Sequence, residues 1–175
     1  FGKVIAKGSA NHPIKFLAKD KNKPWGSIVI QGKKTSGSIF KYVQAKGGSI
    51  TNNALIDYTA QFNIHDNDNF TLENCTFDEN HIGDDNVHIA YSKGRIKYSI
   101  FSHSNSDALD VDISDVEIED NLFIDSGNDG LDIMTTKLKA SGNIFVENGD
   151  KAFSIGEWSN ANIEDSIIHN ANIGL

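Results

Sequence analysis

Aspartates recur at a regular spacing in the second half of the chain, where they could bind a cation or act as acid and base. Asp110 and Asp132 lie 22 residues apart, within the similar strings Leu-Asp-Val-Asp and Leu-Asp-Ile-Met. Asp107 and Asp129 precede them at the same spacing, and Asp112 follows Asp110. If successive repeats stack as strands about 4.8 Å apart, these five carboxylates converge on one face.

Three interpretations of this acidic cluster remain open at the level of the sequence. Like charges opposite one another destabilise a sheet, so something must offset them. The cluster can be a solvated face on which Asp107 and Asp129 serve as turn residues, because Asp readily bonds backbone groups in turns. It can be a Ca²⁺ site formed by Asp107, Asp110, Asp129 and Asp132, since calcium prefers clustered oxygen ligands. It can also be a catalytic pair, because acids on adjacent coils, about 5 Å apart, match the spacing of retaining glycosidases.

A lyase would need a different set of residues. Its general base must remove the proton α to a uronate carboxylate, with support from a cation. Lys151, Arg95 and His88 are the candidates for this base. The expected catalytic residues are therefore Asp110, Asp132, Lys151 and His88.

Two aromatic residues could hold a sugar beside these acids. Trp158 follows a one-residue insertion in the repeat, and Tyr91 lies outside the regular apolar positions. An exposed indole or phenol can stack on a sugar, although Trp158 could equally cap the core. Together with Asp107, Asp112 and Asp129, these aromatics are the expected substrate-binding residues.

These side chains are positioned by an internal repeat of about 22 residues. The units are Asn86–Asp107, Ala108–Asp129, Gly130–Lys151 and Ala152–Ile173. Each unit contains short strings of alternating apolar and polar residues, which indicate strands with one buried face. Each unit is too short for a strand–helix–strand crossover, which needs about 30 residues or more, so it suits one coil of a β-solenoid.

Apolar residues stay in phase from unit to unit. The predicted inward columns are Val87-Leu109-Leu131-Phe153, Ile89-Val111-Ile133-Ile155 and Phe77-Phe101-Phe123-Phe145-Ile168. A polar column of Cys75, Ser99, Asn121, Asn143 and Ser166 runs beside the phenylalanines. Two outward columns are expected, namely Asn63-His88-Asp110-Asp132-Ser154 and His65-Ala90-Asp112-Met134-Gly156.

The sequence therefore predicts an all-β, right-handed parallel β-helix over residues 1–175 as one domain. Residues 1–61 are expected to form irregular, wider coils, with a loop within residues 44–61, and residues 62–175 to form regular coils. The chain starts without Met and stops as another coil opens, so we expect it to be part of a longer protein. Bare solenoid ends are open sheet edges, which predicts end-to-end self-association or a cap.

The chain resembles the right-handed parallel β-helix repeat proteins of the pectate-lyase-like superfamily. The resemblance rests on Pro13-Ile-Lys-Phe16 with Trp25-Gly-Ser-Ile, on Ser106-Asp-Ala-Leu-Asp-Val-Asp, on Ser126-Gly-Asn-Asp-Gly-Leu-Asp-Ile and on Asn148-Gly-Asp-Lys-Ala-Phe-Ser-Ile-Gly. It implies polysaccharide lyases, glycoside hydrolases, epimerases or non-catalytic adhesive modules. We find no complete catalytic signature of the polygalacturonases or pectate lyases, so the resemblance indicates fold more than function.

Composition narrows the classes of protein to which the chain could belong. No apolar run approaches the roughly 18 residues of a membrane span, and the single cysteine, Cys75, excludes an internal disulfide. Residues 1–50 hold ten lysines and one acid, but these lysines are scattered, so we expect no nucleic-acid partner. The prediction is an extracellular or cell-surface module that binds or processes a polysaccharide, with Ca²⁺ as the candidate cofactor. The alternative is a non-catalytic spacer or self-assembling subunit.

Overall fold

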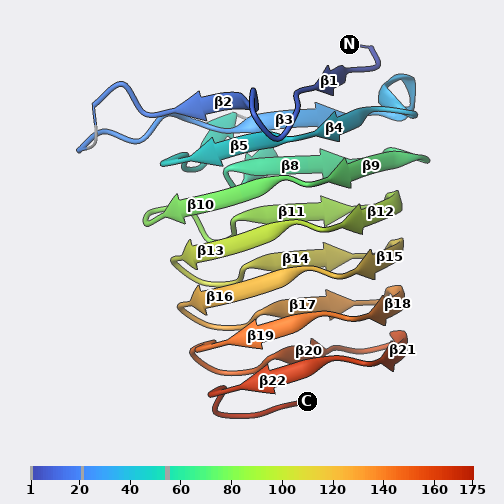
Figure 1. The fold of residues 1–175 in the computed structure, drawn as a ribbon. Helices are drawn as coiled ribbons and strands as arrows, with labels where there is room; N and C mark the ends of the chain where they lie inside the picture. Colours follow the sequence, from blue (N-terminus) through green and yellow to red (C-terminus); the bar gives the residue numbers. More distant parts are fainter. Residues whose placement is uncertain (1, 21, 54–55) are drawn as a thin grey trace.

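The chain winds into a parallel β-solenoid whose successive coils stack along one axis (Figure 1). The structure, a computed structural model, describes residues 2–20, 22–53 and 56–175. Each regular coil contributes one strand to each of three parallel sheets. Within the described ranges the helical element is a single 3-10 turn, η1 (Lys33–Thr35). The all-β solenoid predicted from the repeat is confirmed.

We name the three sheets I, II and III in the order in which each regular coil visits them. Sheet I contains β3 (Ile28–Gln31), β8 (Phe62–His65), β11 (Val87–Ala90), β14 (Leu109–Asp112), β17 (Leu131–Met134) and β20 (Phe153–Ile155). Sheet II contains β1 (Ile5–Lys7), β4 (Ile39–Lys41), β9 (Phe70–Glu73), β12 (Lys93–Lys97), β15 (Asp115–Glu119), β18 (Lys137–Ser141) and β21 (Asn160–Glu164). Sheet III contains β2 (Ile14–Leu17), β5 (Val43–Lys46), β10 (Thr76–Asn80), β13 (Ile100–Ser104), β16 (Leu122–Ser126), β19 (Ile144–Val146) and β22 (Ile167–His169).

The core is a set of columns in which like residues stack from coil to coil. Strand pairing places Leu109 opposite Leu131 and Phe101 opposite Phe123, as the repeat predicts. The phenylalanines of the Phe77–Phe145 column are fully buried. Burying apolar surface continuously in this way stabilises coils that could not bury their own faces alone. In the terminal coil, which has a neighbour on one side only, Ile155 of the predicted inward column is 38% exposed.

Buried polar ladders hold the corners between sheets. At the corner between sheets II and III, Asn121 accepts a hydrogen bond from the backbone N–H of Ser99 and in turn donates to Asn143. At the corner between sheets I and II, the hydroxyls of Ser114 and Thr136 accept from the backbone N–H one coil earlier. These bonds satisfy backbone groups that a tight corner would otherwise leave buried and unpaired.

The N-terminal coils are wider and end in an antiparallel hairpin. In the first coils, Val4 bonds to Ser38, 34 residues away, whereas regular coils are linked at a separation of 22 residues. The hairpin of β6 (Thr51–Asn53) and β7 (Ile56–Tyr58) lies within the stretch predicted to be a loop. The chain that follows it covers Asn63, which is fully buried although its column was expected to face outward. The Asn63 amide donates to the carbonyl of Ala60 instead.

Lysines of the basic N-terminal third pair with acids of the next coil. Lys33 contacts Asp66 and Asp68, and Lys41 contacts Glu73. The uneven charge along the sequence is thus partly neutralised across coils. No helix in the described part of the chain has the length and apolarity needed to cross a membrane.

Candidate functional site

The outer face of sheet I gathers the histidines and aspartates singled out in the sequence. Strand pairing places His88 beside Asp110 and Asp110 beside Asp132, and it places Asp112 beside Met134. These are the outward columns that the repeat predicts. Because side chains alternate between the two faces of a strand, Leu109 and Val111 fill the core while the aspartates between and after them face out.

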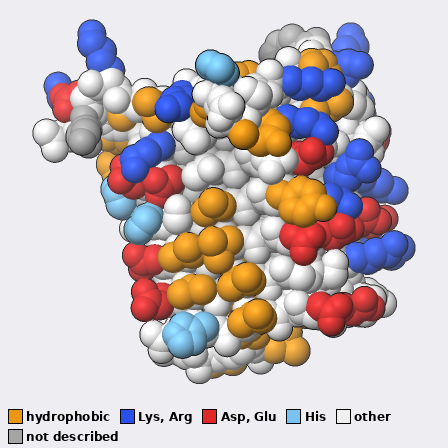
Figure 2. All heavy atoms as spheres, in the orientation of Figure 1, with side chains coloured by type: hydrophobic (Ala, Val, Ile, Leu, Met, Phe, Trp, Pro, Cys, Tyr) orange, Lys and Arg blue, Asp and Glu red, His pale blue; other side chains and the backbone are white. Residues whose placement is uncertain are grey.

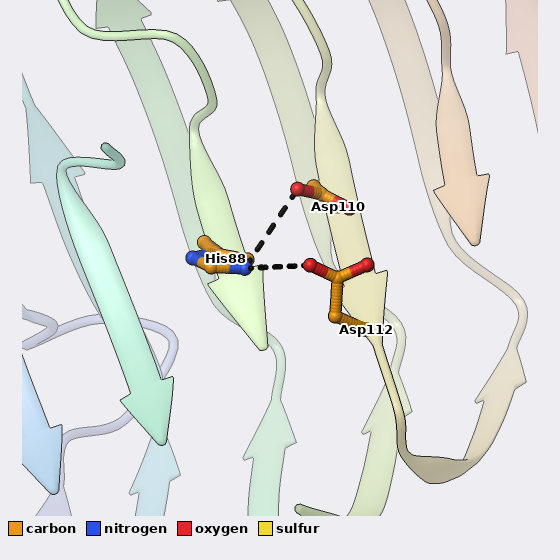
Figure 3. Close-up of side chains that lie close together, drawn as sticks. All are labelled: His88, Asp110 and Asp112. Atoms are coloured by element: carbon orange, nitrogen blue, oxygen red, sulfur yellow. Dashed lines mark ion pairs between the residues drawn. The ribbon is translucent and has the colours of Figure 1, made fainter. Parts of the chain in front are cut away.

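A His/Asp/Asp triad at the centre of this face can hold a metal ion. Nε2 of His88, on β11, lies 3.7 Å from Oδ2 of Asp110 and 3.5 Å from Oδ2 of Asp112, both on β14 (Figure 3). One ligand atom from each residue falls within 4.8 Å of the other two. All three side chains are partly buried. The calcium set expected from the sequence shares Asp110 with this triad but not His88 or Asp112.

His65 supports the triad from the preceding coil. Its Nε2 lies 3.2 Å from Nδ1 of His88, and the two rings meet edge to face. Burial, together with the neighbouring His88, lowers the pKa of His65 to about 4. His65 is therefore neutral at pH 7. Its other flank is covered by Tyr58 of the hairpin, with ring centroids 5.7 Å apart.

Two aspartates of this face, Asp110 and Asp132, have raised pKa values. Burial, reinforced by the carboxylates of Asp112, Asp132 and Asp107 against an opposing effect of His88, raises the pKa of Asp110 to about 7. Burial also raises the pKa of Asp132, although a hydrogen bond from Ser154 opposes the rise. Burial is the first cause of both shifts, and neighbouring carboxylates add to it. A bound cation would favour the charged form of these carboxylates.

Asp107 and Asp129 are engaged at the turn that precedes sheet I. Oδ1 of Asp107 accepts hydrogen bonds of 2.8 Å from the backbone N–H of Asp129 and from the amide of Asn128. Oδ1 of Asp129 accepts from the backbone N–H of Lys151. Each carboxylate thus caps the turn of the next coil with one oxygen. Burial raises the pKa of Asp107 to about 6 despite these bonds.

The column of turn residues that contains Asp107 and Asp129, here called the turn column, begins at Asp85, which was not among the predicted site residues. Asp85 is 2% exposed, and Thr59 donates a hydrogen bond of 3.3 Å to its carboxyl group. Burial, aided by the nearby carboxylates of Asp110, Asp84 and Asp107, raises its pKa to about 9. Asp85 is therefore a neutral carboxylic acid at pH 7.

Lys151 closes the turn column as a cation. Its Nζ contacts the carboxylates of Asp150 and, at 3.6 Å, Asp129. The hydrogen bond to Asp150 raises the pKa of Lys151. These contacts favour a charge-compensating role over that of a general base, which would have to lose its proton.

Tyr91 and Trp158 project from the corner between sheets I and II, beside the acidic face. They line one open groove of about 630 Å³ together with Ile113, Thr135 and Lys137. Trp158 is 88% exposed and Tyr91 is 60% exposed. The structure thus separates the expected substrate-binding residues into two adjacent groups, the aromatic residues in the corner groove and the aspartates on sheet I and its preceding turn.

Comparison with known families identifies the family to which this fold belongs. The family described as the right-handed β-helix region matches residues 34–175. The chain belongs to this family. Among solved structures, the pectate lyase Pel9A is similar over 100% of this chain and 67% of its own chain, at 10% identity and a TM-score of 0.32. No curated protein sequence matches the chain.

In this right-handed β-helix, two residues outside the predicted site lie close to it, namely His65 and Asp85. His65 was placed in the correct outward column, but nothing in the repeat indicated that its ring would reach His88. Asp85 stood in the turn column, and its burial depends on the chain around Thr59.

Proposed function

We propose that the chain binds a polysaccharide along the corner groove and processes it at the adjacent acidic face of sheet I. The observation that carries this proposal is the exposure of Trp158 and Tyr91 within one groove, next to a face of partly buried aspartates. Aromatic rings with a free face and polar neighbours are suited to the apolar faces of sugar rings. A groove that runs across several coils suits a linear polymer.

The backbone of the corner sets where these side chains project. Tyr91, Ile113, Thr135 and Trp158 all adopt positive φ, between 48° and 62°. Asn, Asp or Gly would adopt this conformation at lower cost, and for β-branched residues such as Ile113 and Thr135 it is a genuine outlier. The corner between sheets II and III adopts positive φ as well, at Tyr98 and Asp120, so the conformation belongs to the solenoid corners in general.

The acidic face would supply the chemistry. Asp110 and Asp132 are paired on adjacent strands, at the spacing of about 5 Å that suits a retaining glycoside hydrolase. A lyase reaction would instead use a bound cation to offset the charge of a uronate substrate. Both reactions fit an extracellular or cell-surface protein, which is the location we propose.

Binding can be tested by affinity electrophoresis and calorimetry against a panel of neutral and uronate polysaccharides, with and without divalent ions. We expect Trp158→Ala and Tyr91→Ala each to weaken binding by about tenfold, the effect of one aromatic contact. Tyr98→Ala is the matched control, because Tyr98 is also exposed and has positive φ but lies at the corner between sheets II and III. Equal losses in all three variants, or no binding to any polymer, would contradict the proposal.

A second candidate function, self-assembly, is favoured by the outer face of sheet III. Figure 2 shows hydrophobic side chains gathered along the front strands of that sheet. Ile100, Ile144 and Ile167 are exposed in one column that also contains Leu122. Contiguous exposed apolar surface often marks an interface. Sedimentation equilibrium would show association that Ile144→Lys abolishes, whereas a monomer at high concentration would count against this candidate and against end-to-end stacking.

A further inference from the structure

We propose that His88, Asp110 and Asp112 bind a divalent transition-metal ion of the zinc class, and that His65 positions the imidazole of His88 for this ion. Figure 3 shows the ring of His88 directed at the two carboxylates that β14 presents. The register of β11 and β14 builds this arrangement, because His88 pairs with Asp110 while Ala90, with its small side chain, pairs with Asp112.

The distances within the triad fit ligands around an ion better than hydrogen bonds. Nε2 of His88 lies 3.7 Å from Asp110 Oδ2 and 3.5 Å from Asp112 Oδ2. A charge-assisted hydrogen bond would bring such atoms to about 2.7–2.9 Å. Two ligands of a tetrahedral zinc ion, each about 2.1 Å from the metal, lie about 3.4 Å apart. The observed separations are therefore close to those of ligands that share one ion.

His65 determines what His88 can offer to the two carboxylates. Its Nε2 is 3.2 Å from Nδ1 of His88, so one of these two nitrogens donates to the other. When Nδ1 of His88 donates, its Nε2 carries a lone pair that faces two carboxylate oxygens. In the opposite tautomer, an Nε2–H would point toward the carboxylates at distances too long for a hydrogen bond.

The second ring nitrogen of His88 is left without a partner. Nε2 is inaccessible to solvent and makes no hydrogen bond within the described part of the chain. Buried polar atoms are nearly always paired, so an unpaired one calls for an explanation. A lone pair that meets two carboxylates is satisfied by a cation, and metal-binding histidines commonly donate their other ring N–H to a neighbouring acceptor. In the proposed site, Nε2 of His65 is that acceptor, at 3.2 Å from Nδ1 of His88.

The donor set selects the class of ion. Calcium takes about six to eight oxygen ligands in a flexible shell, whereas an imidazole nitrogen suits zinc, copper, iron and nickel. One imidazole and two carboxylates supply three protein ligands, which is the number that a catalytic zinc site uses when it leaves one position for water or substrate. Binding of the ion requires no sugar. Its action on a sugar oxygen or on a bound water rests on the proposed function.

Calorimetric titration of the chelator-treated whole chain with zinc, and separately with calcium, tests the site. We expect one equivalent of zinc to bind at least about tenfold more tightly than calcium. His88→Ala and Asp112→Asn should each weaken zinc binding by about a hundredfold or more, with circular dichroism confirming the fold. His65→Phe should weaken it by about 10–100-fold, the usual effect of removing a supporting contact. His65→Gln, which retains an acceptor, should lose less.

A measurement that does not depend on metal affinity distinguishes a positioning role of His65 from a packing role. Nitrogen chemical shifts of the metal-free chain should show His88 protonated at Nδ1, and His65→Phe should abolish that preference. His103→Ala is the control for zinc binding, because His103 also lies beside two carboxylates, those of Asp78 and Asp125, but is half exposed. The zinc affinity of the His103→Ala variant should equal that of the unaltered chain.

Several results would overturn the inference. They are the absence of zinc binding, zinc binding that survives both His88→Ala and Asp112→Asn, and an equal loss in His103→Ala. Tighter calcium binding that is unaffected by His88→Ala would assign the ion to the aspartates instead. Polysaccharide binding is measured separately through Trp158, so failure of the zinc site and failure of the proposed function are distinguishable.

Discussion

Phe123 and Phe145 stack with ring centroids 4.6 Å apart and planes within 4° of parallel. On the other side of Phe123, Phe101 stacks at 4.9 Å and 7°. The regularity of this column shows how closely one coil repeats the next. The same register that aligns these rings inside the solenoid aligns His88, Asp110 and Asp132 on its outer face.

Phe123→Ala should lower the free energy of unfolding by about 3–5 kcal/mol, because it removes a fully buried ring between two stacked neighbours. Urea denaturation measures the change. Ile144→Ala, an exposed substitution next to Phe145 in β19, should cost about 0.5 kcal/mol or less. Similar losses in the two variants would show that the column is not the core.

Asn121→Ala should destabilise the chain by about 1–3 kcal/mol, because it leaves buried groups without partners. The side chain accepts from the N–H of Ser99 and donates to the carbonyl of Ile96. Asn121→Ser should cost less, since Ser99 serves the same ladder one coil earlier. If alanine and serine are equally damaging in thermal melts, packing rather than hydrogen bonding accounts for the loss.

Stability should fall between pH 7 and pH 8.5 because of Asp85. Burial raises the pKa of Asp85 to about 9, against about 3.9 in an unfolded chain. Between these values the folded state holds a proton that the unfolded state has released, so raising the pH favours unfolding. The pKa of His65 is lowered in the folded state, so raising the pH stabilises the fold through this residue. That effect is confined to pH values below about 6.5.

Urea midpoints at pH 7 and pH 8.5 test this dependence. The Asp85→Asn variant should lose most of the decline and should be more stable than the unaltered chain at pH 8.5. Asp120→Asn, at an exposed position of the corner between sheets II and III, should keep the decline. A midpoint that rises with pH in the unaltered chain would refute the assignment.

Asp107→Ala should destabilise the chain by about 1–3 kcal/mol in the presence of a chelator. The substitution leaves the buried backbone N–H of Asp129 without a hydrogen-bond acceptor. If Asp107 instead acts through calcium, together with Asp110, Asp129 and Asp132, the loss should appear only when calcium is present. Melting temperatures with millimolar calcium and with chelator separate the two roles. A site occupied at a hundredfold excess over Kd would add about 2.7 kcal/mol.

The sequence predicts the parts of this structure that depend on periodicity. Leu109 and Leu131, or Phe101 and Phe123, occupy equivalent positions because one coil length is repeated, and that length fixes both the inward and outward columns. The column that contains Asp110 and Asp132 follows from the same counting. The right-handed parallel β-helix was therefore predictable in its regular coils.

The remainder of the site depends on contacts that the repeat does not encode. The approach of His65 to His88 is set by ring orientation. The burial of Asn63 and Asp85 is set by the chain around Ala60 and Thr59, which follows an irregular hairpin. Oδ2 of Asp112 lies 3.5 Å from Nε2 of His88, which stands diagonally across from it on the neighbouring strand, and this contact depends on side-chain orientation.

The hairpin β6–β7 makes the two ends of the acidic face of sheet I different from each other. Tyr58 packs beside His65, and the residues after it bury Asn63, so the outward column is closed at that end. From His88 to Ser154 the same column remains partly open to solvent. A ligand that reaches this face therefore meets His88, Asp110 and Asp132 directly, whereas His65 is screened from it by the ring of Tyr58.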